Sequence, residues 1–214
     1  LRLGQAINSV LIDRIGGLAG LLVLVLVSQP LLYQKVTETE ARLGFAALLA
    51  MGFGAIATVM ILSKLPKGLR RFRIVDGLVG LSRALRRILL TPASGLPVLL
   101  LAVFGHACAV SALYIMALSM GLDVLFTDML VIVPAVLLIA MLPISIAGWG
   151  LREAAMINGL ALIGASQSGA LALSILFGLL LIAVGLPGGI LWLIDRKKLP
   201  REELLGATET EGKL

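Results

Sequence analysis

The chain has 214 residues, of which 59% are hydrophobic and only 14% are charged, and its formal net charge is +6. A soluble domain of this length carries more charge and fewer long apolar runs, so the composition excludes that class and indicates a membrane protein. One cysteine and one histidine are too few for a metal site, and we expect neither a metal nor another cofactor. We interpret Cys108 as an inert thiol and His106 as a packed or hydrogen-bonded intramembrane side chain.

Two apolar stretches open the chain and are predicted to span the membrane over residues 7–33 and 43–62. About 20 apolar residues suffice for a helix to cross the hydrocarbon core, and both stretches reach that length. Asp13 and Arg14 are adjacent near the start of the first span, just before a glycine-rich run. The charges of residues 34–42 cancel, so this polar segment is predicted to be a short loop.

Residues 63–90 hold eight basic residues against one acidic residue. Their apolar residues recur at spacings of four and three, which places them on one helical face with arginines opposite. We predict an amphipathic interfacial helix over residues 68–90 that contacts anionic lipid, in preference to a partner protein or nucleic acid. Its membrane-surface residues would be Arg70, Arg71, Arg73, Arg83, Arg86 and Arg87.

The distribution of basic residues also predicts the orientation. Lys and Arg are enriched in cytoplasmic loops, so residues 63–95, the amino end and the carboxyl tail are predicted to be cytoplasmic, in a plasma (inner) membrane. Further spans are expected over residues 96–120 and 169–194. Residues 1–198 would then form a single transmembrane domain, and residues 199–214 a cytoplasmic tail.

The stretch between the last two of these spans leaves two arrangements open. The chain must cross an odd number of times after residue 123, so residues 124–142 and 151–164 either both cross or together form a re-entrant hairpin. The second segment has 14 residues, which gives a helix of about 21 Å against a hydrocarbon core of about 30 Å. This length favours two half-helices, and the predicted class is an all-α, polytopic helical membrane protein with a broken or re-entrant helix pair.

The segment Leu142–Glu153, LPISIAGWGLRE, joins the two half-helices and combines a proline, two glycines and an adjacent Arg–Glu pair. Hydrocarbon tolerates non-helical backbone and ionisable side chains only where protein or a water-filled cavity surrounds them. If Gly150 starts the next helix, free N–H groups and the positive end of the helix dipole point into the break, where Arg152 adds a charge suited to phosphate. We therefore predict lipid-headgroup binding by Ser145, Gly148, Trp149, Gly150, Arg152 and Glu153, together with Asp13 and Arg14.

A purely structural interpretation stands beside this one. Arg152 or Glu153 would form a salt bridge with a partner elsewhere, and that bridge would only lock the bundle. Asp13 and Arg14 are the obvious candidate partners. The two interpretations are compatible, because an ion pair can hold a site and also exchange partners. No catalytic residue is predicted.

The late motif resembles the signature P-x-S-x-x-G-x-G-x-x-E of the lysylphosphatidylglycerol synthase transmembrane region family, which Ser145, Gly148, Gly150 and Glu153 match. The opening string SVLIDRIGGLAG resembles an earlier element of the same family. The resemblance implies a polytopic domain that moves or handles lipid. In the multiple peptide resistance factor, this domain flips aminoacylated phosphatidylglycerol while a separate soluble domain performs lysyl transfer.

Two features depart from the family pattern. The chain begins with Leu rather than Met and lacks the family's first spans, so we expect the C-terminal portion of a longer protein. No soluble transferase domain follows the last span, which argues against phosphatidylglycerol lysyltransferase activity in this chain even though relatives carry that name.

We expect a lipid flippase or lipid-handling transporter for an anionic or aminoacylated phospholipid or a polyprenyl-linked lipid, in a bacterial or archaeal plasma membrane. Two alternatives are kept open: a membrane subunit of a lipid-modifying transferase, with the chemistry in a separate polypeptide, and a small-solute permease. The expected partners are membrane lipids with anionic headgroups and, as a candidate, that separate transferase. No nucleic-acid partner is expected.

Overall fold

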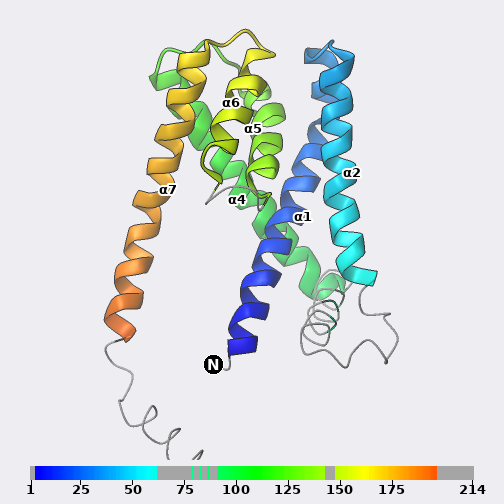
Figure 1. Cartoon of the computed structure of the whole chain (residues 1–214), viewed down its shortest axis with the longest axis vertical. Coiled ribbons are helices and arrows are strands. Elements are labelled where there is room, and N and C mark those ends of the chain that lie inside the picture. Colours follow the sequence, from blue (N-terminus) through cyan, green and yellow to red (C-terminus); the bar gives the residue numbers. More distant parts are fainter. Residues whose placement is uncertain are drawn as a thin grey trace, which may run out of the picture. The chain divides into compact units, whose positions relative to one another are not determined.

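The structure, a computed structural model, describes residues 3–61, 91–142 and 148–196, together with Val79, Ser82 and Arg86. All regular secondary structure in the described part of the chain is helical, which confirms the predicted all-α class. The helices are α1 Leu3–Lys35, α2 Thr39–Ile61, α4 Pro92–Ser119, α5 Phe126–Ala140, α6 Leu151–Ala161 and α7 Gln167–Arg196 (Figure 1).

Four helices of the described residues are long and apolar enough to cross a membrane, so the chain is a polytopic membrane protein. Their crossing segments are Asp13–Lys35, Thr39–Ile61, Gly95–Ser119 and Gln167–Ile194. The chain divides into two compact units, residues 1–174 and 175–214. The boundary falls within α7. The first unit contains the start of α7, up to Ser174, together with the other helices, and the second unit contains the rest of α7.

Within the first unit, α1 is the central helix and packs against α2, α4 and α5. Two clusters of buried apolar side chains join these helices. One lies where α1, α2 and α5 meet, and the other lies farther along α1 towards its amino end. Their buried members are Leu32, Val36, Phe45, Val131 and Ala135 in the first cluster, and Leu21, Leu22 and Leu138 in the second.

Helix α5 runs antiparallel to α1 and lies along only part of it. At the first turn of α5, Asp128 forms an ion pair with Lys35 at the end of α1, with 2.5 Å between Oδ1 and Nζ. At its other end, Met141 lies beside Gly17, near the middle of α1. With 15 residues, α5 is about 22 Å long and shorter than the hydrocarbon core of about 30 Å.

Helix α6 returns along α5 in the opposite direction (Figure 1). Gly148, just before α6, lies against Ala140 at the end of α5, whereas Gly159 lies against Ile132 near its start. With 11 residues, α6 is about 16 Å long. Gly169 of α7 packs on Leu122, in the loop that precedes α5. The two short helices therefore form a hairpin that enters and leaves at the same end of the bundle.

Most of the predicted interfacial helix lies outside the described residues, including Arg70, Arg71, Arg73, Arg83 and Arg87. Val79, Ser82 and Arg86 are helical, and Arg86 is partly buried. Ser82 is buried and its hydroxyl donates to the Met60 carbonyl near the end of α2, at 3.0 Å. The placement of this segment in the headgroup plane stays a prediction.

We expect Asp128→Ala to destabilise the hairpin. One carboxylate oxygen of Asp128 accepts the Leu125 N–H at 2.9 Å and caps α5, while the other pairs with Lys35. Loss of the cap and of a partly buried ion pair should cost about 2 kcal/mol of unfolding free energy. Thermal unfolding in detergent measures the loss. Asp128→Asn keeps an acceptor for Leu125 and should lose about half as much; an unchanged melting temperature in Asp128→Ala would show that this contact does not anchor the hairpin.

Candidate functional site

The hairpin reverses direction at a break in the helix, between Ala140 and Leu151. Gly148 and Gly150 have φ angles of +80° and +83°, which the backbone of a residue with a Cβ rarely adopts. Gly148 is also buried against α5, where a Cβ would lie 3.3 Å from the Ala140 carbonyl oxygen. The spacing Gly-Trp-Gly thus allows the tight reversal into α6. Ser145, the first predicted site residue, lies outside the described residues.

The two glycines should respond differently to alanine. Both substitutions place a Cβ on a residue with positive φ, at a cost of about 1–3 kcal/mol each. Gly148→Ala adds crowding against Ala140, whereas nothing lies within 4 Å of the Cβ position at Gly150. We expect Gly148→Ala to lower the melting temperature in detergent more than Gly150→Ala. Equal losses would mean that close packing at Gly148 contributes nothing.

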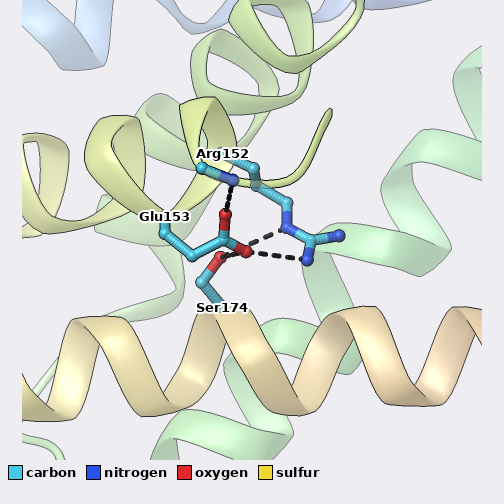
Figure 2. A network of polar contacts seen from close by, with 4 residues as sticks. Arg152, Glu153 and Ser174 are labelled. Atoms are coloured by element: carbon cyan, nitrogen blue, oxygen red, sulfur yellow. Dashed lines mark hydrogen bonds and ion pairs between the residues drawn. The ribbon is translucent and has the colours of Figure 1, made fainter. Parts of the chain in front are cut away.

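A polar network joins the start of α6 to α7 (Figure 2). Arg152 Nη2 lies 2.9 Å from Glu153 Oε1. Ser174 bridges the pair, because its hydroxyl accepts from Arg152 Nε at 3.2 Å and donates to Glu153 Oε1 at 3.3 Å. Arg152 and Ser174 are buried, and the Glu153 side chain is only 12% exposed. Apolar surroundings make isolated charges very costly, so this network keeps both ions in place.

Glu153 also caps its own helix. Its second carboxylate oxygen accepts the N–H of Gly150, the residue before α6. A carboxylate there offsets the positive end of the helix dipole. The expectation of free N–H groups at this end is therefore wrong for Gly150, whose N–H is taken by the chain itself. The site therefore offers one cation and one anion that already contact each other.

Trp149 contacts the Arg152 side chain of this pair. The Arg152 guanidinium lies over the indole ring, 5.1 Å from its centroid, in a cation–π contact. Trp149 itself is 41% exposed. The indole ring is thus partly exposed, while the guanidinium that it contacts is buried.

Asp13 and Arg14 lie in a second polar region of the structure, at a cavity. They line a cavity of about 610 Å³ between α1 and α4, together with His106 and Met141. Within the described residues neither has an ion-pair or hydrogen-bond partner. They are thus not the partners of Arg152 and Glu153, and the predicted salt bridge between the two pairs is wrong. Met141 directly follows α5, so the cavity borders the break.

His106 holds α4 to α1 beside this cavity. Its Nε2 lies 3.0 Å from the Gly17 carbonyl oxygen. A carbonyl only accepts, so Nε2 carries the proton. This contact confirms that His106 is hydrogen-bonded, and it lies within a helix long and apolar enough to cross a membrane. Ser174 is not among the residues predicted for the site, and its signal in the sequence is weak, because it is one of two serines in an apolar helix.

The chain matches a known protein family. The family described as the lysylphosphatidylglycerol synthase TM region matches residues 1–189. This match covers both the Asp13–Arg14 pair and the break with Arg152 and Glu153. Searches of curated proteins and of solved structures gave no match.

Proposed function

The chain belongs to the lysylphosphatidylglycerol synthase transmembrane region family, and on that premise we propose that it is a lipid flippase or lipid-handling transporter of the plasma membrane. The family and the four apolar crossing segments establish a membrane protein with a lipid-related function. Lipid translocation, the plasma membrane and a cytoplasmic amino end are part of the proposal, and the basic segment of residues 63–90 supports the orientation.

One observation carries the proposal: a nearly buried Arg–Glu pair stands at a helix break inside the thickness that the long helices span. Ionisable groups at such depth tend to mark a substrate pathway. A phospholipid phosphate matches Arg152, and the ammonium group of an aminoacylated headgroup matches Glu153. A headgroup with both charges would replace both partners of the pair at once. A purely anionic headgroup would leave Glu153 unpaired and repelled, so we favour aminoacylated phospholipid.

The cavity between α1 and α4 supports a polar route towards the break. Asp13 and Arg14 are unpaired within the described residues, and their cavity is bordered by Met141 at the end of α5. Charged walls of this kind stabilise water and a headgroup where hydrocarbon cannot. In this proposal the headgroup passes along the cavity to the break.

The bridging serine gives a direct test of the site. We expect Ser174→Ala to slow lipid translocation about fivefold, because one hydrogen bond of about 1 kcal/mol positions both charges. The assay uses the whole chain in liposomes and follows fluorescent aminoacylated phosphatidylglycerol from the inner to the outer leaflet. Ser119→Ala is the matched control, since the described bond of the Ser119 hydroxyl goes to the Ile115 carbonyl within its own helix. Equal rates for both variants, or no translocation by the wild type, would contradict the proposal.

A second candidate function follows from the name of the family, which refers to a synthase. The chain would then be the membrane subunit of a separate transferase. Affinity purification from membranes distinguishes the two functions. A transferase that copurifies and modifies lipid only with this chain, without translocation in liposomes, would favour the subunit. A permease for small solutes has no observation of its own in its favour.

A further inference from the structure

A second hollow in the bundle is apolar and lies on the other side of α6 from the charge pair. It is a groove of about 630 Å³ between α2, α5 and α6. Among the described residues that line it, Asn158 is the one with a polar side chain, which donates to the Ala154 carbonyl of its own helix at 2.8 Å. Small residues give the groove its depth, and they are Ala41, Gly44, Ala135, Ala154, Ala155 and Gly159.

The groove starts at the break. Ile139 and Leu151, which flank the break, line one end, and Leu162 lines the other. Helix α6 therefore has two stripes. One stripe buries Arg152 in the polar network, and the other faces the groove along the whole length of the helix. A molecule with a charged head and an apolar tail matches these two stripes, because its head can meet Arg152 while its tail lies in the groove.

The position and lining of the groove favour an acyl chain as its occupant. The groove follows α6, which is about 16 Å long, and its lining is almost entirely apolar. Because one end of the groove lies at the break, a lipid whose headgroup reaches the Arg152–Glu153 pair can extend one hydrocarbon chain along it.

We propose that this groove holds one acyl chain of the lipid whose headgroup engages the break. This inference rests on the proposed function, and it specifies the substrate as a lipid held by head and tail together. An acyl chain that moves from bulk lipid into the groove gains no hydrophobic energy, because both environments are apolar. Its binding free energy comes instead from van der Waals contact with the small side chains of the groove. The groove thereby aligns the tail with α6 and brings the headgroup to Arg152.

Two glycines of α2 provide a matched test. Gly44 lines the groove and Gly54 does not, and a Cβ at either position meets nothing within 4 Å. The whole chain is placed in nanodiscs with phosphatidylglycerol that carries a photoreactive group in its acyl chain, and labelled peptides are mapped by mass spectrometry. We expect labelling of α6 in the wild type and a loss of about tenfold in Gly44→Leu. Gly54→Leu should label as the wild type does.

Other outcomes would overturn the inference. If α6 is labelled as strongly in Gly44→Leu as in the wild type, the groove does not hold the acyl chain. If the label is spread equally over the exposed faces of α2, the acyl chain has no specific site. A crosslink between two copies through an Ala154→Cys variant would show that another chain fills the groove. If Gly44→Leu does not fold, Ala154→Phe blocks the groove from α6, with Ala50→Phe as its control on the exposed face of α2. Acyl labelling does not depend on translocation, so its failure and that of the transport function are distinguishable.

Discussion

Arg152→Ala is expected to destabilise the protein by about 3 kcal/mol, the largest effect of any single substitution considered. The variant leaves the Glu153 carboxylate nearly buried, and its remaining partners among the described residues include the Gly150 N–H and the Ser174 hydroxyl but no cation. Removing one partner of a buried ion pair costs more stability than removing both, because the charge that remains keeps its full desolvation cost. Chemical denaturation in mixed micelles measures the change in unfolding free energy.

The double variant Arg152→Met, Glu153→Gln is the control for this prediction. It removes both charges, and the glutamine side chain has the length needed to cap the Gly150 N–H, so most of the lost stability should return. A loss below about 1 kcal/mol in Arg152→Ala would mean that the pair behaves as a solvated surface bridge. The network would then not be the anchor of α6.

Gly20→Ala should separate α1 from α4. A Cβ at Gly20 would lie 2.7 Å from the Ala102 Cβ and 3.0 Å from its carbonyl carbon, so two backbones must move apart. Such overpacking costs about 1–3 kcal/mol, and it should also weaken the bond between His106 and Gly17. Thermal unfolding in detergent gives the stability loss.

Gly16→Ala is the matched control on the same helix. Its Cβ would lie 3.5 Å from a Val98 methyl group, which is ordinary contact. Alanine also favours a helix over glycine by about 1 kcal/mol, so this variant should be neutral or slightly stabilised. A similar loss in both variants would show that α1 and α4 are not held at close range through Gly20.

The sequence alone is enough to predict the helical membrane class and the short length of the second half-helix. Both follow from apolar run lengths measured against the hydrocarbon core, which the solvent imposes on any chain. The turn at Gly148 and Gly150 could also be predicted, since only glycine adopts their φ angles readily.

The partners of the charged side chains could not be predicted in the same way. Adjacent residues of a helix do not normally face each other, so a distant partner for Arg152 was the reasonable expectation. The structure differs because Glu153 bends back to cap Gly150, which brings its carboxylate beside the neighbouring guanidinium. Ser174 reaches the pair from a separate helix, a contact that depends on how α6 and α7 pack.

The same limit applies to the two hollows. The cavity that Asp13 and His106 share depends on which faces of α1 and α4 meet, and the apolar groove depends on the return of α6 along α5. Small residues in apolar helices indicate close packing, but not where the packing leaves space. The positions of these hollows therefore require the three-dimensional structure.

In the proposed function, the Arg152–Glu153 pair receives a lipid headgroup. The most direct test compares translocation of fluorescent aminoacylated phosphatidylglycerol by wild-type liposomes and by liposomes with the Arg152→Met, Glu153→Gln variant, whose fold should be retained. If the pair binds the headgroup, translocation falls to the protein-free rate while the melting temperature stays near that of the wild type. Translocation at the wild-type rate by this folded variant would contradict the claim and leave the pair a structural anchor.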